Sequence, residues 1–164
     1  MDELLTQQAQ TYARRHHLRL VERLGHGIHG IVYVAERNAE PGNVAIKVHR
    51  SREAYERERD VYLTLREADV EEILGFAVPK LITFDDELLV IEMTIVTRPF
   101  VLDFAGAYLD YTPQFSDEIW SEWEAEKRDQ FESRWPEVQA VLSALEAMDI
   151  YMVDVSPSNI AFLG

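Results

Sequence analysis

The chain has 164 residues, which suits one domain or two small lobes that share a cleft. Its 16 basic and 30 acidic side chains give a formal net charge of −14, which disfavours nucleic acid as a partner, and its 47% of hydrophobic residues suffices for a core. The lack of cysteine excludes disulfides, thiolate catalysis and cysteine-ligated zinc. Without a signal-like N-terminus or an apolar run of about 18 residues, we expect a cytoplasmic protein that binds no membrane.

The first half of the chain is predicted to form a sheet with two helices, because its apolar residues change from helical to alternating spacing and back. The predicted elements are a helix over 3–17, strands near 18–21, 31–35 and 44–48, a helix over 51–66, and a hairpin of strands 81–84 and 88–93. The stretch from Ile73 to Phe84 is otherwise expected to be irregular, with a break at Pro79. This order predicts a five-stranded sheet within residues 1–95.

The second half, residues 96–164, is predicted to be helical, with the boundary near 94–99. Ser116 can cap a helix that runs to Phe131, because a serine side chain accepts a hydrogen bond from the first helical turn. A further helix is expected to start at Pro136, since proline suits a first helical position. Two short apolar runs follow and flank a polar loop. The fold class predicted from both halves is α+β.

A glycine-rich segment precedes the second strand, where residues 25–32 read G-x-G-x-x-G-x-V. In a dinucleotide-binding fold the third glycine opens a helix, whereas Gly30 opens a β-branched strand, so these glycines cap a hairpin. Glycine is expected there because it accepts positive φ and lets backbone N–H groups approach phosphate oxygens. The alternative is an ordinary glycine-rich hairpin. His26 and His29 lie in the loop and are expected to face solvent.

Residues 44–47 read V-A-I-K, so Lys47 ends an apolar strand and its charge needs a partner. The helix over 51–66 offers one, because Glu58 is the only charge on its apolar face. We therefore expect an ion pair between Lys47 and Glu58, with Glu56 as the partner if the helical register slips. The alternative is that Glu58 is a solvated charge on a highly charged helix.

Asp154 and Asn159 lie five residues apart in the polar loop between the last two apolar runs. A carboxylate near the attacking hydroxyl and an amide oxygen on magnesium are two parts that phosphoryl transfer needs. A polar turn with Ser-Pro and Ser-Asn is the alternative interpretation.

Together and in this order, these segments resemble the protein kinase-like superfamily. The resemblance implies a two-lobe fold, with an antiparallel sheet and one helix in the first lobe and a strongly reduced helical second lobe. It implies ATP and Mg²⁺ as ligands. The residues that it assigns to the nucleotide are Gly25, Gly27, Gly30, Val32, Ala45 and Lys47, with Ile91 as gatekeeper and Glu92 to Thr94 as the hinge that reads adenine.

The same resemblance implies catalysis by Asp154 as base, assisted by Lys47 and Glu58, with Asn159 and Asp154 as magnesium ligands. Met152-Val153 replaces the family's His-Arg, and Ser156 replaces its loop lysine, which is similar to the atypical RIO-type kinases. The family's D-F-G motif is expected after Asn159, where only five residues remain. By this interpretation the chain lacks the D-F-G segment and the principal magnesium carboxylate.

Three functions fit these residues. The first is a minimal atypical kinase or other ATP-dependent phosphotransferase. The second is a pseudokinase that senses a nucleotide or binds a protein partner or a second copy, for which Trp120, Trp123 and Trp135 offer a surface unless they pack in the core. The third is one half of a larger kinase, which predicts exposed apolar surface.

Overall fold

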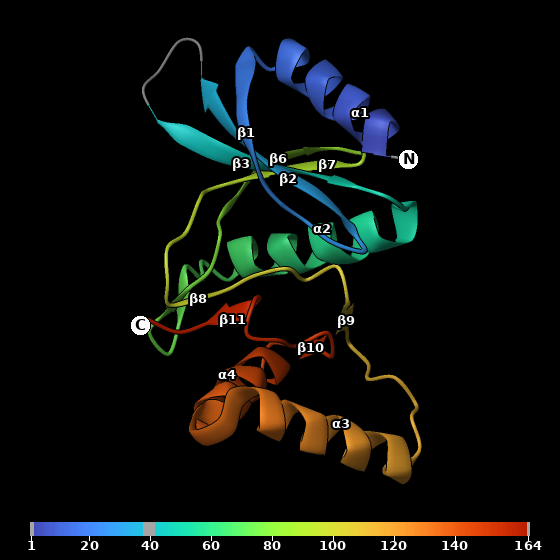
Figure 1. The fold of residues 1–164 in the computed structure, drawn as a ribbon, viewed down its shortest axis with the longest axis vertical. Coiled ribbons are helices and arrows are strands. Elements are labelled where there is room, and N and C mark those ends of the chain that lie inside the picture. The colour runs from blue at the N-terminus through green and yellow to red at the C-terminus, as the bar shows by residue number, and fades with distance from the viewer. Residues whose placement is uncertain (1, 38–41, 164) are drawn as a thin grey trace.

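The computed structural model describes residues 2–37 and 42–163. It is a mixed α+β structure, in which an antiparallel sheet and helix α1 lie at the top of Figure 1 and helices α3 and α4 lie at the bottom. The first elements are α1 (Asp2–Arg15), β1 (Leu18–His26), β2 (Gly30–Arg37), β3 (Asn43–His49), α2 (Arg52–Glu67), β4 (Glu72–Ile73), β5 (Phe76–Ala77), β6 (Leu81–Asp85) and β7 (Val90–Met93). The remaining elements are β8 (Phe100–Val101), β9 (Ala107–Leu109), α3 (Asp117–Phe131), the 3₁₀ turn η1 (Glu132–Arg134), α4 (Trp135–Glu146), β10 (Ile150–Met152) and β11 (Ile160–Ala161).

The large sheet has five strands in the order β1-β2-β3-β7-β6, and every neighbouring pair is antiparallel. Because successive side chains of a strand point to opposite faces, β3 serves two packing layers. Ile46 and Val48 pack with α1 on one face, and Ala45 joins the core on the other face, where Lys47 meets α2. The sheet is thus covered on both faces, by α1 above and α2 below (Figure 1).

Helix α2 carries the stripe that its sequence predicts. Ser51 has an extended backbone and its side chain accepts a hydrogen bond from Ala54 N at 3.2 Å, which starts the helix. The buried residues of α2 are Ala54, Tyr55, Glu58, Val61, Tyr62 and Leu65. Their spacing places them on one helical face, so a single carboxylate is carried into the interior with the apolar side chains.

A second sheet of four strands, in the order β11-β8-β5-β4, lies below α2. Strand β8 pairs in parallel with β5 and antiparallel with β11, where Ile160 lies opposite Val101. The prediction of irregular structure around residues 73–77 is therefore wrong, because β4 and β5 pair with each other and β5 also pairs with the distant β8. Strands of two residues are too short to show a periodic signal in the sequence. The strand that precedes Asp103 is held beside the strand that follows Asn159.

The lower helices begin and end near their predicted positions. Ser116 accepts a hydrogen bond from Ile119 N at 3.2 Å and caps α3, which ends at Phe131. Helix α4 starts at Trp135, one residue before the predicted Pro136, which lies in its first turn. One hydrophobic core joins these helices to α2 and to the lower face of the large sheet. Within the described residues, no helix is both long and apolar enough to cross a membrane.

Candidate functional site

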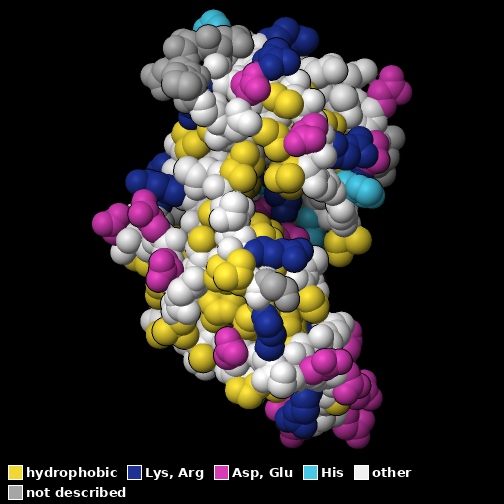
Figure 2. Space-filling model, turned by 60° about the vertical axis from the view of Figure 1, so that its left-hand side comes forward, with side chains coloured by type: hydrophobic (Ala, Val, Ile, Leu, Met, Phe, Trp, Pro, Cys, Tyr) yellow, Lys and Arg dark blue, Asp and Glu magenta, His cyan; other side chains and the backbone are white. Residues whose placement is uncertain are grey.

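Lys47 lies between two carboxylates beneath the large sheet. Its Nζ is 2.8 Å from Glu58 Oε1 and 2.8 Å from Asp103 Oδ1. Lys47 is 6% exposed and Glu58 is fully buried, whereas the Asp103 side chain keeps 34% of its surface. Figure 2 shows a hollow at mid-height in which basic and acidic side chains lie recessed between the upper and lower parts of the molecule. The expected pair of Lys47 and Glu58 is formed, and Asp103 joins it.

Glu58 has a partner for each of its oxygens. Oε1 also accepts from His49 Nε2 at 2.7 Å, and Oε2 accepts from the backbone N–H of Phe104 at 2.7 Å. His49 is itself buried, and its Nδ1 lies 3.1 Å from Leu89 O. A buried carboxylate is tolerated only when it is paired in this way, so Glu58 is a fixed anchor for three elements.

The two buried charges hold one another in the ionised form. Burial alone would raise the pKa of Glu58, but the charge of Lys47 and the hydrogen bond from His49 outweigh it and lower that pKa to about 2. Burial alone would lower the pKa of Lys47, but the charges of Glu58 and Asp103 outweigh it and raise that pKa. Each of the two charges thus stabilises the ionised form of the other.

Asp103 is the residue that the sequence interpretation missed. Residues 103–106 read D-F-x-G, so the expectation that the chain lacks a D-F-G-like segment is wrong. The motif stands before the Asp154 loop in the chain instead of after Asn159. The pairing of β8 with β11 brings it there, and Leu102 N donates to Asn159 O at 2.9 Å. A motif search that assumes the order of motifs in the kinase family looks only after Asn159. It therefore misses a segment that lies earlier in the chain and reaches the site by strand pairing.

The D-F-x-G segment also contacts α2 and the Asp154 loop. The Phe104 ring packs edge-on against Tyr62 of α2, with ring centroids 5.3 Å apart. Gly106 lies directly against Asp154, because a Cβ on Gly106 would fall 2.7 Å from Asp154 Cβ. One four-residue segment therefore touches Lys47, α2 and the candidate base.

Asp154 and Asn159 differ in how firmly they are held. The Asp154 side chain is 45% exposed. Asn159 is 4% exposed, and its side chain closes the loop by donating to Asp154 O at 2.7 Å and accepting from Ser156 N at 2.8 Å. An amide oxygen has two lone pairs, so one remains for a metal ion. No group of three or more His, Cys, Asp or Glu side chains with metal-binding geometry occurs in residues 2–37 and 42–163.

Among the glycines of residues 25–30, a close contact explains Gly30, and backbone angles explain none of them. None of Gly25, Gly27 and Gly30 has positive φ, so that expectation is wrong. A Cβ on Gly30 would fall 2.1 Å from Val48 O, which only glycine avoids. A Cβ on Gly25 or Gly27 would meet nothing within 4 Å. Gly30 is needed by the sheet, and the other two leave open space at the turn.

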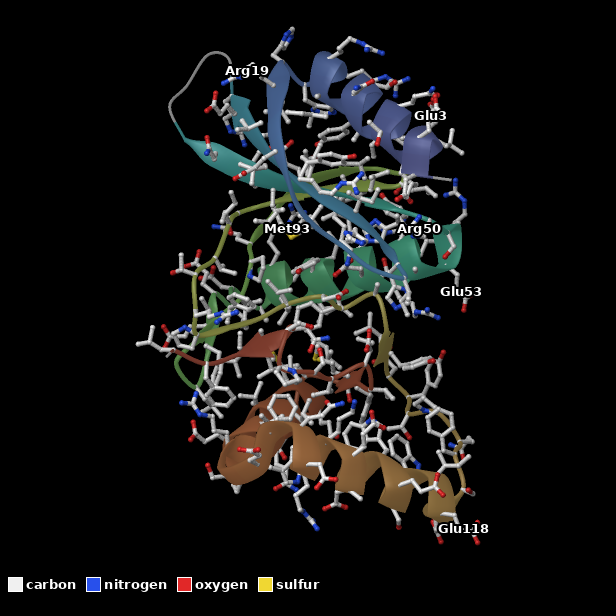
Figure 3. All side chains as sticks on the ribbon, in the orientation of Figure 1. Glu3, Arg19, Arg50, Glu53, Met93 and Glu118 are labelled. Carbon is white, nitrogen blue, oxygen red and sulfur yellow. The ribbon has the colours of Figure 1, made fainter. Side chains whose placement is uncertain are left out.

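His29 does not face solvent as predicted, although His26 is exposed. The His29 side chain is 21% exposed and its Nε2 lies 3.7 Å from Asp154 Oδ2. Arg50, which Figure 3 labels at the end of β3, donates its backbone N–H to His29 O at 2.9 Å and its Nε to Gly27 O at 3.2 Å. The glycine-rich turn is thus tied to β3 and reaches across to the Asp154 loop, a contact with no signal in the sequence.

Four of the predicted nucleotide residues share the lower face of the large sheet. Val32 lies opposite Lys47 in the β2–β3 ladder, and Lys47 lies opposite Ile91 in the β3–β7 ladder, so the three form a row. Ala45 is two residues before Lys47 and points the same way. It pairs with Met93, which Figure 3 labels between the sheet and α2. Ala45 and Ile91 are buried in the core beside the Lys47 ammonium group, and Val32 is partly exposed.

The residues predicted as the hinge, Glu92 and Thr94, make hydrogen bonds within the protein. Glu92 is 2% exposed and points to the opposite face, where Tyr12 Oη donates to it at 2.7 Å and Arg37 Nη2 at 2.9 Å. Its backbone lies within the sheet, between β3 and β6. Thr94 N already donates to Lys80 O at 3.0 Å. An adenine ring would have to displace that bond to accept a hydrogen bond from Thr94 N, and the hinge stays a prediction.

Comparisons with known proteins give a likeness to solved structures. No protein-family model matches the chain, and no curated protein matches it. Among solved structures, the chain is similar to the kinase domain of PknI from Mycobacterium tuberculosis, at 19% identity, with a TM-score of 0.39 and 80% of this chain covered. The match covers 48% of that domain, so the chain spans about half of the length of the protein it resembles.

Proposed function

We propose that this chain is an atypical kinase-like protein that binds ATP with Mg²⁺ and transfers phosphate. The site is the cleft between the lower face of the large sheet and the Asp154 loop. The observation that carries the proposal is the placement of Lys47 at 2.8 Å from both Glu58 and Asp103. In this proposal the buried Glu58 is a permanent partner of the Lys47 ammonium group. The partly exposed Asp103 can leave Lys47 when a phosphate or a metal ion binds.

Lys47 and Glu58 form the fixed part of this site. Glu58 is held by His49 and by Phe104 N, so it keeps the ammonium group in place when Asp103 moves away. An ammonium group fixed at the cleft supplies the local positive charge that a phosphate needs in a chain of net charge −14.

Asp103 and Asn159 are the residues that would hold a magnesium ion. Both offer oxygen atoms, which Mg²⁺ prefers, and Mg²⁺ commonly takes one or two carboxylates together with substrate phosphates. Two protein ligands and the lack of a larger acidic cluster in the described residues fit that mode. When bound, ATP would supply the phosphoryl group and Mg²⁺ the charge that neutralises it in transfer.

Asp154 serves as the base in this proposal. Its exposed carboxylate can reach an acceptor hydroxyl and take its proton, while Asn159 fixes the loop that carries it. The contact between His29 and Asp154 places the glycine-rich turn over the same point.

Labelled phosphate transfer tests this function. ATP labelled at the γ-phosphate is incubated with the protein alone and with protein and small-molecule hydroxyl acceptors. We expect transfer that Asp154→Ala lowers by at least about a hundredfold. The control is Asp129→Ala, which removes an exposed acid from α3 and leaves the cleft intact. No transfer to any acceptor, or equal transfer by Asp154→Ala, contradicts the proposal and leaves the pseudokinase alternative.

A further inference from the structure

All three tryptophans of the chain line one cavity, away from the cleft. The cavity has a volume of about 320 Å³ and lies between α3, α4 and residues 151–153. Trp123 stands nearly perpendicular to Trp120, at 84°, and to Trp135, at 69°. Tyr151 adds a fourth aromatic ring to the lining. A volume near 300 Å³ with aromatic walls is the size and composition of a small-molecule site.

Core packing accounts for Trp135 and for part of Trp123, which packs against the core from its edge, but not for Trp120. Trp135 is 4% exposed and packs in the core, stacked on Phe131 with ring centroids 6.1 Å apart. Trp120 and Trp123 are half-buried at the cavity. Large aromatic surface left at a concave site indicates binding more than packing.

The charged side chains that line the cavity are both acidic. Glu124 and Glu146 line it, and no lysine, arginine or histidine does. Glu124 accepts from Arg128 at 2.9 Å, whereas Glu146 is exposed at the end of α4. Tryptophan faces attract cations, and carboxylates beside them add to that attraction. The lining therefore favours a cationic occupant and disfavours an anion.

One polar group of the cavity wall lacks a partner. Trp123 Nε1 donates to Val153 O at 3.0 Å. Trp135 Nε1 is buried and has no hydrogen-bond partner among the described residues. An unpaired buried N–H is unfavourable, and an oxygen acceptor on a ligand would satisfy it after a small shift of the ring.

We propose that this cavity binds a small organic cation that carries an oxygen acceptor, such as a quaternary ammonium alcohol. The cation lies against the tryptophan faces near Glu146, and its oxygen faces Trp135. Val153 precedes Asp154 in the chain, so the bond from Trp123 to Val153 connects the cavity wall to the Asp154 loop. The inference goes beyond the proposed function, because binding here needs neither ATP nor the cleft.

A matched pair of probes tests the proposal on the full chain without nucleotide. Choline is compared with 3,3-dimethylbutan-1-ol, which has the same shape and hydroxyl group and no charge. Because every tryptophan of the protein lines the cavity, intrinsic fluorescence reports occupancy directly, and calorimetry gives the affinity. We expect choline to bind about tenfold more tightly than the neutral alcohol. Equal affinity, or no fluorescence change with choline, overturns the proposal.

Charge variants locate the site. Glu146→Gln is expected to weaken choline binding about three- to tenfold and to leave binding of the neutral alcohol unchanged. Glu137→Gln is the control, because Glu137 is an exposed acid on the same helix that does not line this cavity. Equal weakening by both variants would show that only the overall charge attracts the cation, and the proposal would be wrong.

Discussion

The Lys47 cluster and the Asp154 loop both contact the D-F-x-G segment but are built differently. Lys47, Glu58 and His49 are buried, and each contacts a charged or polar partner within 3.1 Å. The Asp154 carboxylate is 45% exposed, and Nε2 of its neighbour His29 is 3.7 Å away. A buried charge must be paired before the chain can fold, whereas an exposed carboxylate is solvated by water and stays free to react. The first region is fixed by folding, and the second is left available for a ligand.

The strongest test of this contrast is removal of the buried carboxylate. Glu58→Ala removes the buried carboxylate that Lys47 and His49 share and leaves Lys47 with Asp103 alone, so we expect a loss of about 3–5 kcal/mol in the free energy of unfolding. Denaturant unfolding followed by circular dichroism measures it. The control is Glu56→Ala on the same helix, whose side chain is 46% exposed and whose loss should cost less than about 1 kcal/mol. Equal losses for the two variants would contradict the buried network.

Acid should remove the same stabilisation more gradually. The pKa of Glu58 is about 2 in the folded protein, below its ordinary value of 4.5, so its ionised form stabilises the fold above pH 4.5. That contribution, on the order of 3 kcal/mol, is lost as the pH falls from 4.5 toward 2. Unfolding free energies measured from pH 6 to pH 2.5 should fall steeply in the wild type and less steeply in Glu58→Gln. Identical slopes would mean that Glu58 is not the group that titrates.

A smaller effect separates the glycines of the turn. Gly30→Ala forces a methyl group against Val48 O and should cost about 1–3 kcal/mol in stability. Gly27→Ala meets open space and should change stability by less than about 0.5 kcal/mol. Thermal unfolding of the two variants compares them directly. A loss in Gly27→Ala as large as that in Gly30→Ala would show that the turn is packed and not open.

The smallest effect is expected at the contact between the two regions. His29→Ala removes a partly exposed contact of 3.7 Å, so stability should change by less than about 0.5 kcal/mol. In the phosphate-transfer assay, however, the same variant should lower activity severalfold if the turn covers Asp154. Unchanged transfer would show that the contact has no role in the reaction, and a large loss of stability would place Asp154 in the fixed region.

The sequence predicts the buried Lys47 cluster better than the surroundings of the Asp154 loop. The large sheet, α2 and the pair of Lys47 with Glu58 were predictable, because one charge in an apolar strand and one in an apolar helical stripe need each other. Asp103 was missed because its place depends on the pairing of β8 with β11, two strands of two residues each. The contact of His29 with Asp154 and the bond of Thr94 N to Lys80 O are set by loop geometry, which has no periodic signal.

The central claim is that Asp103, supplied from before the Asp154 loop, completes a magnesium-dependent ATP site with Lys47. Calorimetric titration of ATP with and without Mg²⁺ tests it in the wild type, in Asp103→Asn and in the control Asp129→Asn. The account predicts that Mg²⁺ strengthens ATP binding by at least about tenfold in the wild type and the control, and that Asp103→Asn loses this gain. Binding of ATP that Mg²⁺ does not affect, or an undiminished magnesium effect in Asp103→Asn, would contradict it.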